Sequence, residues 1–62
     1  MRNNKILKEE IFEFVDKNQP VGLGEILAGL SLSHFSGARV VLDLIKENKL
    51  NYSSPGKKIV VG

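Results

Sequence analysis

The stretch that decides the fold is GLGEILAGLSLSHFSGARVVLDLIKENKLNY, residues 22–52. Its first apolar residues recur at the spacing of one helix face: Leu23, Ile26, Leu27 and Leu30. Gly22 stands where the cap of this short helix falls, and glycine is tolerated at that position. Ser31-Leu32-Ser33 then forms a turn, in which Ser33 is the best N-cap for the helix that follows. This part of the chain predicts a short helix, a tight turn and a longer helix.

The longer helix is expected to run from His34 to about Asn48. Its apolar residues cover nearly half of the helix circumference: Phe35, Gly37, Ala38, Val41, Leu42, Leu44 and Ile45. A helix that is apolar over so wide an arc is expected to lie centrally, packed on other helices and on a pair of strands. The other residues form the side that is expected to face outward: Ser36, Arg39, Val40, Asp43, Lys46 and Glu47.

Upstream of this stretch, residues Asn4 to Asn18 are expected to form the first helix. Four apolar residues fall on one of its faces: Leu7, Ile11, Phe14 and Val15. Asn3 or Asn4 can cap its start, and Asn18-Gln19-Pro20 ends it, because the residue before a proline disfavours the helical conformation. Val21 follows the proline and is expected to be extended, as a short strand or a bridge.

Downstream, the periodicity changes after Lys49 from that of a helix to that of a strand. Leu50 and Tyr52 alternate with a polar residue, and the segment from residue 57 to residue 61 is rich in β-branched side chains. Between them, Ser53-Ser54-Pro55-Gly56 is a turn signal. The end of the chain is therefore predicted to be a β-hairpin.

Composition limits the classes of protein that are possible. The chain has 62 residues, so residues 1–62 are expected to form one domain with a small core. It has no cysteine, which excludes disulfides and thiolate metal sites and suits a reducing compartment. Apolar runs are too short to span a bilayer, and acidic residues interrupt the N-terminal segment where a secretory signal would be apolar. We expect a soluble, cytoplasmic protein.

Taken together, the segments EILAGLSLS and ARVVLDLIKENKLNY resemble the "E-I-A … L … S … V … L … L … G-L-I" pattern of the winged helix-turn-helix DNA-binding family. The resemblance is to a fold-level pattern over the whole chain. It implies an α+β fold, with three helices and a C-terminal β-hairpin wing. The chain departs from the pattern where Asn48-Lys49 replaces the usual glycine before the wing, although asparagine can adopt the left-handed conformation needed there. The turn before the longer helix is also one residue longer than the commonest one.

The resemblance further implies that the third helix enters the major groove of double-stranded DNA while the wing touches the backbone. The residues that it points to are Ser33, His34, Ser36, Arg39, Val40, Lys46, Lys57 and Lys58. Arg39 has the planar fork that recognises guanine, and Val40 could contact a thymine methyl group or a partner subunit. Lys57 and Lys58, at the hairpin tip, are the expected phosphate contacts.

Further phosphate contacts could come from the start of the first helix, where the basic residues are Arg2, Lys5 and Lys8. One protomer would then make about three to five phosphate contacts. Because this number is modest, a homodimer on two half-sites or a protein partner would be needed for tight binding. A transcriptional regulator is the expected role.

A winged-helix adaptor that binds protein is the alternative. The net charge is only +2, and Asp43 and Glu47 on the outer side of the third helix would repel phosphate unless they are paired. Ile6 and Phe12 lie off the apolar face of the first helix and, with Val40, could form a protein contact. A lysine pair at a hairpin tip is also a common means of keeping a sheet edge from aggregating.

An enzymatic function is not expected. His34 is the one histidine, and no nucleophile, base and orienting group can be assembled around it. A metal site would need several converging ligands, so His34 is more simply a surface residue. Gly22 and Gly24 lack the spacing and the preceding strand of a phosphate-binding loop. We expect no cofactor, no metal and no small-molecule ligand.

Overall fold

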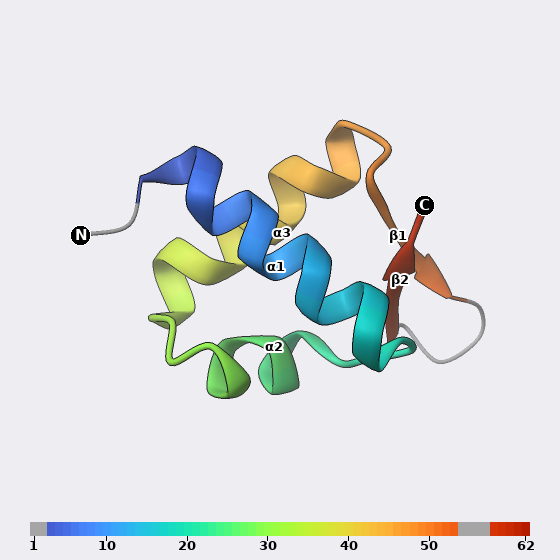
Figure 1. The fold of residues 1–62 in the computed structure, drawn as a ribbon, viewed down its shortest axis with the longest axis horizontal. Coiled ribbons are helices and arrows are strands. Elements are labelled where there is room, and N and C mark those ends of the chain that lie inside the picture. Colours follow the sequence, from blue (N-terminus) through green and yellow to red (C-terminus); the bar gives the residue numbers. More distant parts are fainter. Residues whose placement is uncertain (1–2, 54–57) are drawn as a thin grey trace.

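The structure, a computed structural model, describes residues 3–53 and 58–62, and this part of the chain holds three helices followed by a two-stranded antiparallel hairpin (Figure 1). The elements are α1 (Asn4–Asn18), α2 (Leu23–Gly29), α3 (His34–Lys46), β1 (Leu50–Ser53) and β2 (Lys58–Val61). The predicted α+β class is confirmed, and the order of elements is consistent with a winged-helix layout. Two predicted phosphate contacts, Lys57 and Arg2, lie outside the described residues, as do the other residues of the predicted hairpin tip, 54–57.

Local signals set the ends of α1 as predicted. The Asn3 side chain accepts a hydrogen bond from the backbone N–H of Ile6 at 2.8 Å, which caps the helix. The helix ends at Asn18, two residues before the proline. Its buried residues are Leu7, Ile11 and Val15, and Phe14 packs half-buried beside them.

Val21 connects the hairpin to the helical part of the molecule. It forms an isolated antiparallel bridge with Ile59, in which each residue donates its backbone N–H to the carbonyl oxygen of the other. Within the hairpin, Leu50 pairs with Val61 and Tyr52 with Ile59. Val21 and Ile59 are both buried, so the bridge closes the core on the side of the hairpin, and the extended conformation predicted for Val21 is confirmed.

The turn between α2 and α3 is held by its own backbone. Ser31 adopts a left-handed conformation with φ of 55°, and the N–H of Leu32 donates to the carbonyl oxygen of Leu27 at 2.9 Å. Ser33 caps α3 as predicted, because its hydroxyl oxygen accepts a hydrogen bond from the N–H of Ser36 at 3.2 Å. The start of α3 is therefore fixed by a side chain and not only by packing.

The face of α3 that packs into the core agrees with the prediction only in part, because Gly37, Val41 and Leu44 are buried as predicted but the helix is turned toward Val40. Its buried residues are Gly37, Val40, Val41 and Leu44. Val40, expected to face outward, is only 4% exposed, whereas Phe35 and Leu42, expected in the core, are 93% and 48% exposed. The physical reason is that α3 has two neighbouring apolar strips, one with Phe35 and Leu42 and one with Val40 and Leu44, so periodicity alone does not choose which strip is buried most deeply.

The C-terminal end of α3 also differs slightly from the prediction. The helix ends at Lys46 rather than near Asn48. Asn48 takes the left-handed conformation with φ of 63°, as its position suggested, and its N–H donates to the carbonyl oxygen of Ile45 at 3.0 Å. The chain can then reverse into β1, whose first residue, Leu50, is buried.

The core draws residues from all three helices, the bridge and both strands. Its buried members are Leu7, Ile11, Val15, Val21, Ile26, Val40, Val41, Leu44, Leu50 and Ile59. Among the described residues, no helix has the length and apolar character needed to cross a membrane.

Candidate nucleic-acid interface

The outer face of α3, which we define as His34, Phe35, Ser36, Arg39, Leu42 and Lys46, is exposed over its whole length. The side of α3 opposite to it holds Gly37, Val40, Val41 and Leu44 and packs into the core. No element in residues 3–53 and 58–62 covers the outer face. Ser33, just before the helix, is also exposed. The structure thus brings together five of the predicted contact residues, Ser33, His34, Ser36, Arg39 and Lys46, and leaves their side chains accessible.

Val40 is the predicted contact residue that the structure removes from this face. Its side chain is buried among the core residues, so it cannot meet a base or a partner subunit. The apolar surface expected from Val40 is provided instead by Phe35 and Leu42. The periodicity of the sequence placed both in the core. That placement followed the spacing of Phe35, Ala38, Leu42 and Ile45 at intervals of three and four residues. A second regular spacing was also present in the sequence, and it is the one that is buried: Gly37, Val40, Val41 and Leu44.

Arg39 and Lys46 give the outer face its positive charge. Among the described residues, neither side chain forms a hydrogen bond or an ion pair. Asp43 is half-buried at the edge of this face, four residues after Arg39 and three before Lys46, which is the spacing of neighbours on a helix surface. Arg39 and Lys46 are therefore available to an anionic partner without breaking an existing contact.

Lys58, in contrast, already has a partner. Its Nζ donates to Oε1 of Glu25 at 3.2 Å, which connects β2 to the first turn of α2. Both side chains are well exposed, and such pairs contribute little net stability, but a phosphate would still have to displace Glu25. Lys58 is a weaker candidate for phosphate binding than the sequence alone suggests.

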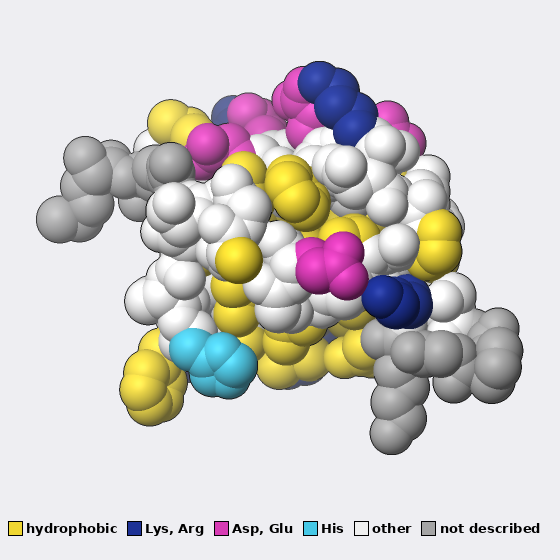
Figure 2. All heavy atoms as spheres, turned by 90° about the horizontal axis from the view of Figure 1, so that it is seen from below, with side chains coloured by type: hydrophobic (Ala, Val, Ile, Leu, Met, Phe, Trp, Pro, Cys, Tyr) yellow, Lys and Arg dark blue, Asp and Glu magenta, His cyan; other side chains and the backbone are white. Residues whose placement is uncertain are grey.

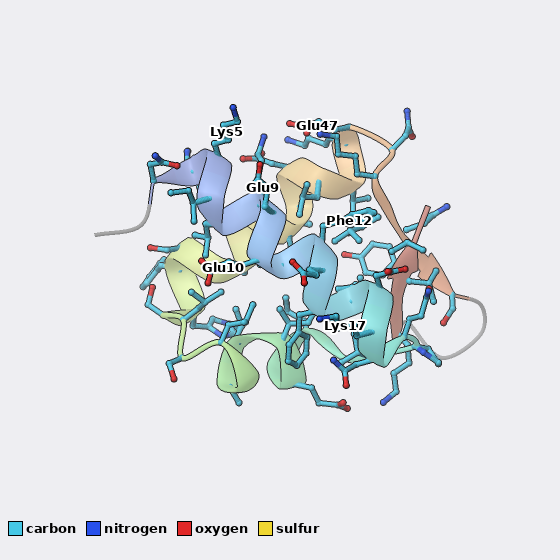
Figure 3. The ribbon with its side chains drawn as sticks, viewed as in Figure 1. Lys5, Glu9, Glu10, Phe12, Lys17 and Glu47 are labelled. Atoms are coloured by element: carbon cyan, nitrogen blue, oxygen red, sulfur yellow. The ribbon has the colours of Figure 1, made fainter. Side chains whose placement is uncertain are left out.

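Lys8 and Glu47 form the other long-range ion pair, which connects α1 to the end of α3. The Nζ of Lys8 donates to Oε2 of Glu47, and Lys49 lies 3.9 Å from the other carboxylate oxygen. Figure 3 shows Glu47 at the end of α3, close to the edge of α1 that carries Lys5 and Glu9. Lys8 is thus engaged within the protein, and the charge of Glu47, which counted against phosphate binding, is compensated.

This ion pair shifts the protonation of both groups. The hydrogen bond with Glu47 raises the pKa of Lys8 above 10.5, and the same bond lowers the pKa of Glu47 below 4.5. A carboxylate with a lowered pKa stabilises the fold above its unfolded pKa and loses this effect as the pH falls through its folded value. For the lysine, the effect is present below 10.5 and is lost as the pH rises through the raised value.

We therefore predict that Glu47→Gln is slightly less stable than the wild type at neutral pH. The difference should shrink when the pH falls below 4.5, because the wild-type carboxylate becomes protonated. Urea unfolding followed by circular dichroism, repeated across the acidic pH range, measures the difference in stability between the variant and the wild type. A double-mutant cycle with Lys8→Gln isolates the pair. A difference that stays constant down to the lowest pH would show that the effect comes from the side-chain replacement and not from the ion pair.

An apolar hollow lies on the outer face of α3. It is lined by His34, Phe35, Ser36, Ala38, Arg39 and Leu42. Figure 2 shows the chain's one histidine at an edge of the molecule beside protruding hydrophobic side chains, while acidic side chains gather along the opposite edge. This edge therefore combines apolar surface with little negative charge.

A second hollow lies between α1 and the end of α3. Its lining residues are Lys5, Lys8, Glu9, Phe12, Glu13, Leu44 and Lys49. Phe12 is 38% exposed here, and Figure 3 shows it on the same side of α1 as Lys5 and Glu9. Ile6, on another side of α1, is 47% exposed. Acids and lysines are mixed around this hollow, so it has no dominant charge.

Within the described part of the chain, no three histidine, cysteine or carboxylate side chains cluster closely enough to hold a metal ion. Comparisons of the chain with protein-family models, with curated proteins and with solved structures find no match.

Proposed function

We propose that the protein is a small winged-helix DNA-binding protein that acts in the cytoplasm as a transcriptional regulator. The observation that carries this proposal is the uncovered outer face of α3, with Arg39 near its middle and without an ion-pair partner among the described residues. A helix that projects in this way from a compact support is the element that enters the major groove in helix-turn-helix proteins.

In this proposal, residues at the start of α3 approach the edges of the bases. Arg39 supplies two parallel N–H donors to the N7 and O6 acceptors of a guanine. Ser33 and Ser36 also lie in the first turn, where a hydroxyl group can donate to a base or a phosphate. However, the Ser33 oxygen already accepts the capping hydrogen bond from Ser36, so its remaining capacity is mainly its own O–H.

Few cations are available for the phosphate backbone. Lys5 and Lys46 are exposed and have no ion pair among the described residues, whereas Lys8 and Lys58 are paired. About two or three phosphate contacts per protomer would give a shallow dependence of affinity on salt, since each contributes about 0.9 to the log–log slope. Two protomers on neighbouring half-sites would double this slope, which makes a dimer on DNA the natural arrangement.

We predict that Arg39→Ala weakens binding to duplex sites selected from a random-sequence library by about tenfold, within the range expected for one bidentate contact to guanine. Fluorescence anisotropy at low and moderate salt measures this. Arg39→Lys should recover only part of the loss, because lysine keeps the charge but not the planar fork. Lys17→Ala is the matched control, since it also removes one positive charge, from an exposed residue of α1 that pairs with Glu13. If the wild type shows no salt-dependent binding, the proposed function is wrong.

Binding to another protein is the second candidate function, and the hollow beside Phe12 favours it. This hollow is lined by Phe12 and Leu44 together with lysines and acids, and protein interfaces commonly combine apolar and charged residues in this way. It lies on α1 and at the end of α3, away from the N-terminal part of the outer face. Chemical-shift mapping with duplex DNA separates the two candidates, because DNA should shift residues 33–39 and leave Phe12 and Glu13 unchanged.

A further inference from the structure

We propose that Phe35 contacts the 5-methyl group of a thymine that neighbours the guanine contacted by Arg39, so that the protein prefers thymine-containing major grooves. This inference rests on the proposed DNA-binding function. It names the base chemistry that α3 recognises, and it gives Phe35 a role that the sequence did not suggest.

The starting observation is the exposure of Phe35. Its side chain is 93% exposed in the first turn of α3, two residues after the capping residue Ser33. A phenylalanine in water forgoes the stabilisation that its burial would bring, and Leu42 adds further exposed apolar surface on the same strip. Such a strip indicates a binding surface.

The fold itself cannot cover Phe35. The helix side opposite to it holds Gly37, Val40 and Leu44, and these residues already fill the core. Turning α3 to bury Phe35 would expose these core residues and move Gly37 from its close packing against α2. The partner of Phe35 must therefore come from outside the described chain.

A second copy of the chain fits this face poorly. Arg39 and Lys46 run along one edge of the strip formed by Phe35 and Leu42. In an antiparallel pairing of two α3 helices, this edge would face the same edge of the other copy, so two cations and the one carboxylate of Asp43 would meet an identical set with the same net positive charge, which disfavours the contact. The occupant that suits the face is therefore anionic and carries apolar groups.

The major groove of DNA has both properties. Its edges are lined by phosphates, and each thymine projects a methyl group into it, which phenylalanine can contact. Phe35 and Arg39 are four residues apart and thus neighbours on the helix surface, so one can meet a thymine methyl while the other meets an adjacent guanine. Both lie in the first half of α3, the part of a docked helix that reaches base edges.

The test compares two random duplex libraries that are identical except that uracil replaces thymine in one of them. Uracil lacks only the methyl group, so the phosphate charge and base pairing are retained. Selection from the thymine library followed by sequencing should enrich sites in which thymine neighbours guanine. The same sites made with uracil should bind the wild type about fourfold more weakly, the factor that corresponds to ~0.8 kcal/mol for one methyl-sized apolar group.

Two variants test whether Phe35 is the residue that causes the preference for thymine. Phe35→Ala should keep its fold, because the side chain is almost fully exposed, and should bind thymine and uracil sites equally. Phe12→Ala, which truncates a phenylalanine of α1, is the matched control and should keep the wild-type preference for thymine.

Three outcomes would overturn the inference. If the wild type binds both libraries equally and in a salt-dependent way, Phe35 does not contact a methyl group, although the DNA-binding function stands. If it binds neither library, the proposed function and this inference both fail. If Phe35→Ala converts a dimer to a monomer in gel filtration and leaves the thymine preference unchanged, the outer face of α3 is occupied by a second copy.

Discussion

Replacing Ile11 with alanine is expected to remove more than half of the protein's folding stability. Ile11 is 0% exposed and lies in the middle of α1, within the core cluster that also holds Val15, Ile26 and Leu44. Removing such a side chain costs about 2–5 kcal/mol. A chain of 62 residues has a total stability of about 3–9 kcal/mol, from the usual range per residue. The substitution therefore removes most of the stability.

Urea unfolding followed by circular dichroism measures this loss. Ile6→Ala is the matched control, because it makes the same chemical change in the same helix at a side chain that is 47% exposed. We expect the control to cost less than about 1 kcal/mol, as surface substitutions usually do. Equal losses for the two variants would mean that α1 does not present the Leu7, Ile11 and Val15 face to the core.

The elements with local signals could be predicted from the sequence. α1 begins and ends as predicted because Asn3 supplies the cap and Pro20 prevents continuation, and both effects act within a few residues. Ser33 fixes the start of α3 in the same way. Asn48 ends the helical region because it tolerates a positive φ. None of these features depends on distant parts of the chain.

The orientation of α3 could be predicted only in part, because two neighbouring strips of its surface are apolar. Phe35, Ala38, Leu42 and Ile45 form one strip, and Gly37, Val40, Val41 and Leu44 form another. Which strip is buried depends on contacts between α3 and the other elements, and periodicity within one helix contains no such information. This error also affected the predicted contact residues. Val40 was expected on the exposed side of α3, but the residue exposed there is Phe35.

The ion pairs of the candidate site also could not be predicted from the sequence, because their partners are far apart in the chain. Lys8 pairs with Glu47 across 39 positions of the sequence, and Lys58 pairs with Glu25 across 33. Both lysines were expected to bind phosphate, since the sequence shows the charges but not their partners. Among the described residues, the structure leaves Arg39 and Lys46 as the unpaired cations of α3, whereas Lys58 of the hairpin is paired.

Gly37→Val is expected to destabilise the protein by about 1–3 kcal/mol, the usual cost of overpacking a core. A Cβ atom at Gly37 would overlap Cδ2 of Leu27 and would lie 3.1 Å from Cβ of Leu32. Leu27 can change its rotamer, but the Cβ of Leu32 moves only with the backbone. The two methyl groups of valine should therefore push α3 away from α2 and from the turn that precedes it.

Gly24→Val is the matched control for this prediction. Gly24 lies in α2, where an added Cβ would meet nothing within 4 Å. Valine has a higher helix propensity than glycine, so the control should be neutral or slightly stabilising. Thermal unfolding of both variants, with amide chemical shifts of Leu27 and Leu32 in Gly37→Val, tests the contact. If both variants unfold at the wild-type temperature, α2 and α3 are not packed as closely as the structure has them. If only Gly37→Val is destabilised, glycine at this position lets α3 lie against the turn, with Val40 inward and Phe35 outward.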